Sequence, residues 1–423
     1  MRIALRLSSL LILATATHAV AETATGWTLH PSVTARVGYD DNIFLQDRAI
    51  PDPLVTGAVP DGAGSAFVRV GVVLDAAWQL SPAFKFTAAY SPELVRYEEF
   101  SSENHDDHRL DLGLTGRVDA WSYQLKSCLL FIDGDDVAPT YGQIGGAPAI
   151  GAASIRSRRE QFNAKLAGNA TRTFDHGFVR VVGESLLNDY RTHWSSARGY
   201  ANYVDRSEWN VGLDAGRNVK KDFALVTGVR VGGQYQDNLV LGSPTDPIDY
   251  SNTLVRALVG VEGQACSDLT VRLLAGPDFR HFDNHIAAGV DRSPTTRYIE
   301  ASATWTPRKT DSVTFAYKDY LWVSSGGRCA YQSATGDLQW KHAFNADWSA
   351  SLGANVQAGD FRDYAANRLD WIYTGTVCLS RNLGAATKLD LEVIREIGDS
   401  APDGYPGRDY SRLQVSLGLR RMF

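Results

Sequence analysis

Residues 411–423, SRLQVSLGLRRMF, carry the pattern that decides the fold. Side chains of a strand alternate between two faces, and here one face is apolar and the other polar. A soluble protein seldom leaves such an apolar row uncovered, whereas a strand between lipid and a watery lumen needs it. The apolar face of this predicted closing strand comprises Leu413, Val415, Leu417, Leu419 and Phe423; the polar face comprises Arg412, Gln414, Ser416, Gly418 and Arg420.

The N-terminus has the features of a cleaved secretory signal. Arg2 and Arg6 precede a short apolar run, and Ala19-Val20-Ala21 supplies the small residues that a signal peptidase needs. The run is shorter than the ~20 apolar residues of a membrane-spanning helix. We therefore expect residues 1–21 to be a signal peptide and residues 22–423 to be the exported domain.

Composition excludes several functions. Removing residues 1–21 takes away two arginines and no acids, so the formal charge moves from −6 to −8, and we expect no nucleic-acid partner for so acidic a chain. No later run approaches the length of a membrane helix, so a membrane-spanning chain of this sequence has to form a closed barrel. The four cysteines, Cys128, Cys266, Cys329 and Cys378, lack the close spacing of a zinc site.

A repeated hairpin pattern covers the rest of the chain. Two long alternating stretches joined by a short turn at residues 81–82 recur seven more times, separated by longer connections rich in Gly, Pro, Asp, Asn and Ser. One connection, residues 324–327, is short. This alternation is typical of bacterial barrels with periplasmic turns and extracellular loops. With a first strand near residues 31–40, it predicts an all-β, transmembrane antiparallel up-and-down β-barrel of about 18 strands, with 16 as the alternative and both termini periplasmic.

Aromatic residues are placed as interfacial anchors would be. Trp78, Trp121 and Trp305 lie beside the expected short turns, while Tyr235 and Phe279 lie near the opposite strand ends. Two such girdles are what a membrane barrel requires at its two interfaces.

The polar face of such a barrel would line the lumen, and its basic residues slightly outnumber its acids. In one interpretation these charges only pair across strands and keep the wall hydrated; in the other, rows of Arg and Lys give the pore a mild anion preference. The lumen-lining candidates are Arg69, Asp75, Arg109, Asp111, Arg117, Lys126, Lys165, Arg180, Glu184, Arg230, Arg256, Glu262, Arg272, Glu300 and Arg412.

About eighteen strands leave an open channel unless a loop folds inward. The long connection from Asp133 to Ser157, rich in Gly and Ala, is the candidate constriction loop, and a loop that stays outside the barrel is the alternative.

Residues that could carry chemistry are few. Residues 103–108 (ENHDDH) combine carboxylates and imidazoles without the ligand spacing of a defined metal site, so they indicate a solvated acidic loop. His193, His281 and His285 could serve a surface hydrolase, which would also need an acid and a nucleophile at the rim. We therefore predict no catalytic, cofactor-binding or metal-binding residues, no cofactor, and no enzyme activity.

The first expected strand leads into residues 37–45, VGYDDNIFL. Here the chain resembles a family of outer-membrane β-barrel porins whose members begin with a Tyr-Asp-Asp-Asn-aliphatic-Phe stretch, and the hairpin rhythm and terminal Phe423 extend the resemblance over the mature chain. The resemblance implies an outer-membrane barrel, often found alongside surface-polysaccharide systems, without an agreed substrate or catalytic residues. Arg421 departs from the usual assembly signal, which favours an aromatic residue at that position.

Together these observations predict a porin-like channel in the outer membrane of a Gram-negative bacterium, passing small polar solutes by passive diffusion with a mild anion preference. A surface-polysaccharide export pore is the first alternative, and lumen aromatics would favour it because sugars stack on them. An outer-membrane surface enzyme is the second. The expected partners are outer-membrane lipid, the barrel-assembly machinery, and small polar solutes or a polysaccharide.

Overall fold

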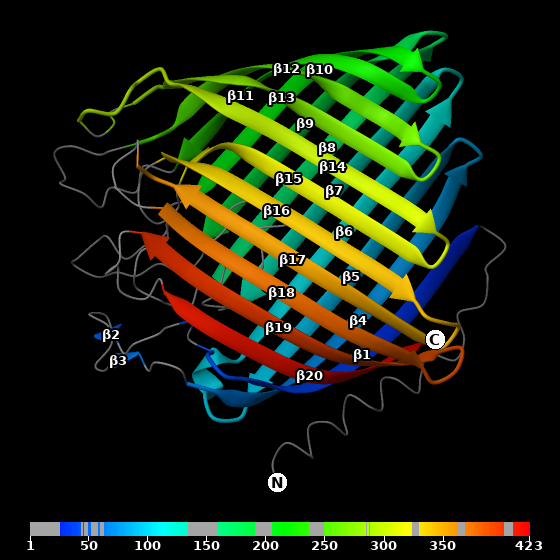
Figure 1. The fold of residues 1–423 in the computed structure, drawn as a ribbon, viewed down its shortest axis with the longest axis vertical. Helices are drawn as coiled ribbons and strands as arrows, with labels where there is room; N and C mark the ends of the chain where they lie inside the picture. The colour runs from blue at the N-terminus through cyan, green and yellow to red at the C-terminus, as the bar shows by residue number, and fades with distance from the viewer. Residues whose placement is uncertain are drawn as a thin grey trace.

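The alternating stretches of the sequence form long antiparallel strands in the computed structural model (Figure 1). The structure describes residues 26–43, 45, 50–51, 58–59, 63–133, 160–190, 205–236, 249–284, 286, 288–323, 330–362, 369–401 and 409–423. The elements are β1 (Trp27–Asp40), β2 (Ile50–Pro51), β3 (Ala58–Val59), β4 (Ser65–Ser81), β5 (Phe84–Tyr97), the 3-10 helix η1 (Ser101–Glu103), β6 (His105–Val118), β7 (Trp121–Asp133), β8 (Glu160–Phe174), β9 (Gly177–Tyr190), β10 (Arg206–Lys220), β11 (Phe223–Gln236), β12 (Asn252–Cys266), β13 (Leu269–Phe282), β14 (Thr295–Arg308), β15 (Asp311–Val323), β16 (Ala330–Ala343), β17 (Trp348–Asp360), β18 (Leu369–Asn382), β19 (Thr387–Ala401) and β20 (Tyr410–Met422).

The eighteen long strands form one closed sheet, because β1 pairs with both β4 and the last strand, β20. Every other long strand pairs with its neighbours in chain order. The predicted all-β, up-and-down antiparallel barrel is therefore confirmed, with 18 strands rather than 16. The sequence pattern did not predict the small hairpin of β2 and β3 within the first long connection.

Short turns lie at one end of the barrel, where Figure 1 also marks the C-terminus. Two of these turns hold Asp119 and Asp222 at positive φ (50° and 59°), which Asp tolerates better than most residues. The first and last residues of the sheet lie at the same end of the barrel. Gly26 O accepts a hydrogen bond from Gln79 N (3.3 Å), and Phe423 N donates one to Pro31 O (3.0 Å). The first and the last strand of the barrel therefore both have their outer chain ends beside the short turns.

Some strand ends differ from the sequence prediction. β1 begins at Trp27 rather than near residue 31, and the Trp27 ring stacks on Trp78 with centroids 4.8 Å apart. β6 begins at His105, within residues 103–108 that were expected to form a solvated acidic loop, because His105 already pairs with Val95 of β5.

The barrel closes through polar contacts between the end of β1 and the start of β20. Asp40 is fully buried and accepts hydrogen bonds from Arg412 Nη2 (2.5 Å) and Gln414 Nε2 (2.7 Å). Asp41 Oδ1 accepts from Leu413 N (2.6 Å). Asn42 donates its amide to Ser411 O (3.0 Å), and its backbone N–H donates to Asp40 Oδ1 (3.1 Å). The Asp-Asp-Asn stretch therefore joins the first strand to the last.

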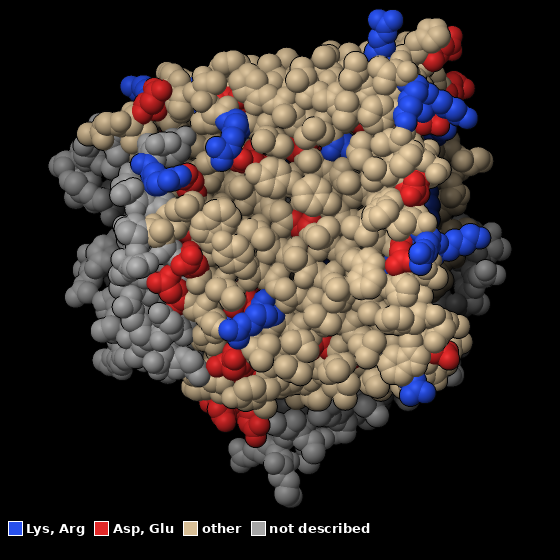
Figure 2. Space-filling model, viewed as in Figure 1, with Lys and Arg blue, Asp and Glu red and all other residues tan. Residues whose placement is uncertain are grey.

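The two faces of the sheet differ in chemistry. Large apolar side chains cover the outside, as on β12, where Val255 and Val259 are 47% and 63% exposed. Figure 2 shows that the face over β15 to β19 is mostly uncharged across its middle and that Lys, Arg, Asp and Glu gather toward its two ends. Among the described residues, no helix is long and apolar enough to cross a membrane.

Candidate functional site: the inner wall of the barrel

Contacts between strands that are not neighbours identify the inward face. Arg206 on β10 donates to Val323 O on β15 (2.7 Å), and Gln234 on β11 donates to Leu321 O (3.1 Å). Such contacts can form only across the lumen of a closed sheet. We followed the strand register and the side-chain alternation from these residues around the sheet. All fifteen lumen-lining candidates lie on the same face.

Most of the basic candidates are held in ion pairs on this wall. Arg180 on β9 contacts Asp214 (2.8 Å) and Glu262 (2.7 Å), and Arg230 contacts the other Asp214 oxygen (2.6 Å). Buried charges are tolerated only when they are paired and hydrogen-bonded, and Asp214 is fully buried. The remaining pairs are Arg69–Glu93, Arg109–Asp111, Lys165–Glu184, Arg256–Asp278, Arg272–Glu300 and Arg412–Asp40.

Glu93 and Asp278 are acidic partners that the sequence candidates do not include. Glu93 follows Pro92 in β5, and Asp278 follows Pro277 in β13. Proline cannot donate to a sheet and is uncommon in a strand interior. In the structure both strands continue beyond the proline, and the two acids face inward. They offset much of the basic excess that the sequence indicated.

Three neighbouring cations on β5, β6 and β7 stay outside this network and form what we call the cationic patch: Lys85, Arg117 and Lys126. All three are exposed, and none forms an ion pair with a described residue. Lys85 pairs in register with Thr115 of β6, while Arg117 lies two residues further along that strand and Lys126 faces Gly113. Since successive residues on one face of a strand are about 7 Å apart, the three side chains are near neighbours.

Lys85 was absent from the sequence candidates, although its neighbours in the sequence indicate that it faces inward. It stands between Phe84 and Phe86 directly after a short turn. Large aromatic residues belong on the apolar outer face of the sheet, so the lysine between them faces inward. Asp75 also lies on the inward face and is exposed, without an ion pair to any described residue.

The end of β15 and the start of β16 turn away from the barrel wall. We define the inward corner as residues 320–323 of β15 with Ala330 and Tyr331 of β16. β15 pairs with β14 only as far as Asp319, opposite Ile299, whereas its pairing with β16 continues to Val323. Trp322 and Tyr331 are 1% and 0% exposed. The corner therefore packs inside the barrel.

Side chains with potential for chemistry do not converge in the described part of the chain. Strand alternation separates residues 105–108: His105 and Asp107 are buried on the inward side, while His108 contacts the Tyr90 hydroxyl (2.8 Å) on the outside. His281 Nδ1 lies 2.9 Å from Ser293 Oγ on the exposed rim. No group of three or more potential metal-ligating residues occurs among the described residues.

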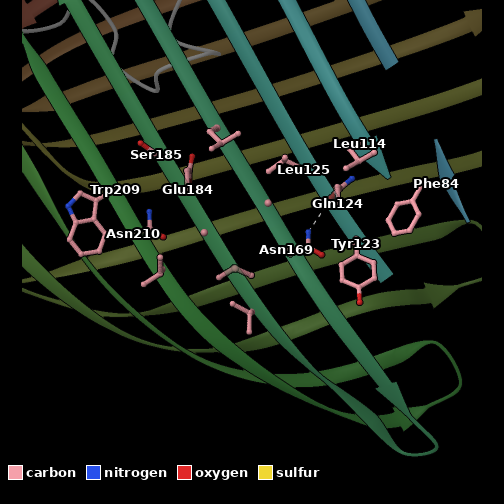
Figure 3. Close-up of a pocket in the computed structure, with 16 residues that line it drawn as sticks. Phe84, Leu114, Tyr123, Gln124, Leu125, Asn169, Glu184, Ser185, Trp209 and Asn210 are labelled. Carbon is pink, nitrogen blue, oxygen red and sulfur yellow. Dashed lines mark hydrogen bonds between the residues drawn. The ribbon is translucent and has the colours of Figure 1, made fainter. Parts of the chain in front are cut away.

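A hollow of about 630 Å³ lies on the outer face, between β5 and β10. Gly168 and Gly183 oppose each other in register there, so no side chain fills the space between Leu125 and Val211. Figure 3 shows Trp209 at one end of the hollow, and Phe84 and Tyr123 at the other. The hollow opens on the apolar side of the sheet, away from the charged wall.

Several predictions concern residues outside the described part of the chain. These are the signal peptide (residues 1–21), the candidate constriction loop after Asp133, two of the three rim histidines, His193 and His285, and Cys329. The other three cysteines are free thiols.

Comparison with known proteins adds little beyond the architecture. No family model and no curated protein sequence matches the chain. Among solved structures, it is similar to the siderophore receptor PirA from Pseudomonas aeruginosa (9% identity, 95% of this chain and 81% of that chain, TM-score 0.42). It is also similar to OccAB4 from Acinetobacter baumannii (10%, 95% and 100%, 0.40) and to the outer membrane protein opdK from Pseudomonas aeruginosa (10%, 94% and 99%, 0.41). Likeness at this level carries no functional argument.

Proposed function

We propose that the chain is a porin-like channel in the outer membrane of a Gram-negative bacterium and passes small polar solutes by passive diffusion. The observation that carries the proposal is a closed 18-stranded sheet with an apolar outside and a charged inside. Lipid stabilises the first surface and water the second, whereas the reverse placement of either would be costly. The short-turn end then faces the periplasm, as is usual in bacterial barrels.

Water access to the inner wall supports diffusion through the lumen. The Arg109 and Asp111 side chains are 44% and 40% exposed although they lie on the inward face. A wall of hydrated positive and negative charges suits small polar solutes. A solute that loses part of its hydration shell in the lumen gains polar contacts with the wall, so its desolvation cost stays small.

The cationic patch supports a mild anion preference. The paired arginines contribute little net field, since each has a carboxylate within about 4 Å. Lys85, Arg117 and Lys126 have no such partner among the described residues and therefore attract anions at their part of the wall. The preference should be mild because the patch covers only β5 to β7 of an eighteen-stranded lumen.

Residues 1–21 are proposed to direct export and to be removed, leaving residues 22–423 as the barrel domain. Outer-membrane lipid and the barrel-assembly machinery are the proposed partners of the mature chain. N-terminal sequencing of protein recovered from outer membranes tests this: a chain starting at Glu22 supports cleavage after Ala21, and a chain that keeps residues 1–21 contradicts it.

Liposome swelling tests diffusion. Vesicles that contain the refolded protein should swell in isotonic solutions of small neutral sugars and amino acids, more slowly as the solute grows. Vesicles that swell no faster than protein-free ones would contradict the proposal. Reversal potentials in a KCl gradient test the anion preference, and a clear cation preference would refute it.

The structure favours neither alternative function. Aromatic residues do face inward, but Tyr298, Tyr320 and Trp322 are at most 6% exposed and pack against one another and against arginines, so their faces are not available to stack on a sugar chain. At the rim, His281 and Ser293 lack a described acid that would orient the imidazole, as hydrolysis by such a pair requires.

A further inference from the structure

The place where β15 leaves the barrel wall suggests how the lumen is narrowed. Backbone pairing between β14 and β15 stops at Ile299 and Asp319, but β15 and β16 stay paired up to Val323 and Ala330. The inward corner is thus a two-stranded piece of wall that has turned into the lumen. A strand that leaves a sheet exposes backbone carbonyls, which need new donors when they are buried.

Inward-facing side chains of β10, β11 and β13 supply those donors. Val323 O accepts from Arg206 Nη1 (2.7 Å), and Leu321 O accepts from both Gln234 Nε2 and Arg280 Nη2 (3.1 Å each). The three donors lie on β10, β11 and β13, whereas the acceptors lie on β15. We call the three donors, Arg206, Gln234 and Arg280, the latch.

The latch is held in place by its own neighbours. Gln234 also donates to Glu208 (2.9 Å), and Arg280 contacts Asp278 (2.7 Å) and Asn252 (2.7 Å). Polar groups that are fixed by such contacts lose little additional freedom when they bind the corner. The latch therefore stabilises one position of the corner rather than a set of loose ones.

Apolar packing closes the space between the corner and this wall. Leu321, Trp322 and Val323 are at most 1% exposed, and they belong to one buried cluster with Leu186 of β9 and Leu258 of β12. The Arg206 guanidinium lies 4.9 Å from the centre of the Trp322 ring, a favourable cation–π distance. With so little exposure, water cannot pass between the corner and strands β9 to β13.

We propose that the inward corner is the fixed constriction of the channel, which blocks the part of the lumen next to β9–β13 and so sets the size limit for solutes. This inference rests on the proposed channel function. It assigns the constriction to the wall itself, where the end of β15 pairs with the start of β16. The indole of Trp322 is the largest side chain of this barrier, and the latch keeps it inside the lumen.

Trp322→Ala tests the proposal directly. Loss of the indole should open a path through the sealed space between the corner and strands β9 to β13, so single-channel conductance should rise, on the order of twofold, and liposome swelling should extend to larger sugars. The matched control is Trp371→Ala, because Trp371 stacks on Tyr373 on the outer face of β18 and should leave both readouts unchanged. For each variant, slower migration of the boiled sample than of the unheated sample in a gel shows that the barrel has folded.

A latch variant keeps the test valid if Trp322→Ala does not fold. Arg206→Met combined with Gln234→Ala removes two donors and leaves the indole in place, and should give noisier current with a higher mean conductance. If the unaltered channel conducts and the folded variants keep its conductance and size limit, the constriction proposal is wrong and the channel function stands. Absence of conductance in the unaltered protein and in the variants would overturn both proposals.

Discussion

The contacts that close the barrel allow a quantitative prediction for Arg412→Ala. Arg412 binds the fully buried Asp40 carboxylate with two nitrogens, at 2.9 Å from Nε and 2.5 Å from Nη2, and is itself only 12% exposed. Removing the guanidinium leaves a buried negative charge with Gln414 as its main remaining donor. Breaking a buried ion pair on one side costs about 3–5 kcal/mol. We expect a loss of that size in the free energy of unfolding.

The assay is urea unfolding of the refolded barrel in lipid vesicles, followed by tryptophan fluorescence. Arg362→Ala is the matched control, because Arg362 pairs with Asp360 at the same distance class (2.6 Å) but is 56% exposed. Such an exposed pair contributes about 0.2–1 kcal/mol. Adding Asp40→Asn to Arg412→Ala should recover part of the loss, since the unpaired charge disappears. A loss for Arg412→Ala no larger than that of the control would refute the reasoning.

Two further predictions concern the inner and outer walls. Arg117→Glu with Lys126→Glu should shift the reversal potential in a KCl gradient toward cation preference, whereas Lys309→Glu, in a short turn outside the lumen, should not; equal shifts would contradict the role of the cationic patch. Gly212→Val should destabilise the barrel by about 1–3 kcal/mol in urea, because a Cβ there would meet Val229 O at 2.1 Å. Gly375→Val, with nothing within 4 Å of such a Cβ, should not.

The barrel itself was predictable because its strands obey a strict period of two. Alternation in residues 411–423 and in the hairpins gives each strand one apolar and one polar face, and no tertiary detail is needed to read it. The same alternation places candidates such as Arg180 and Glu262 on one face. It says nothing about which charges meet, since strand register and the reach of each side chain determine that.

Three features could not be predicted from the sequence, for physical reasons. Glu93 and Asp278 stand beside prolines, which cannot donate to a sheet, and their inward position depends on sheet pairing that continues past the proline. The contacts of the Asp-Asp-Asn stretch with β20 appear only once the two ends of the chain meet. The inward corner has no local signal except an unusually short connection, because long-range donors such as Arg206 stabilise it.

Conductance of single molecules tests the channel function most directly. Mature protein, refolded and added to a planar lipid bilayer in 1 M KCl, should produce stepwise current increases of uniform size, because a polar lumen that crosses the membrane conducts ions. A correctly folded and inserted barrel, verified by resistance of the strands to protease, that leaves the bilayer without conductance steps would contradict the account.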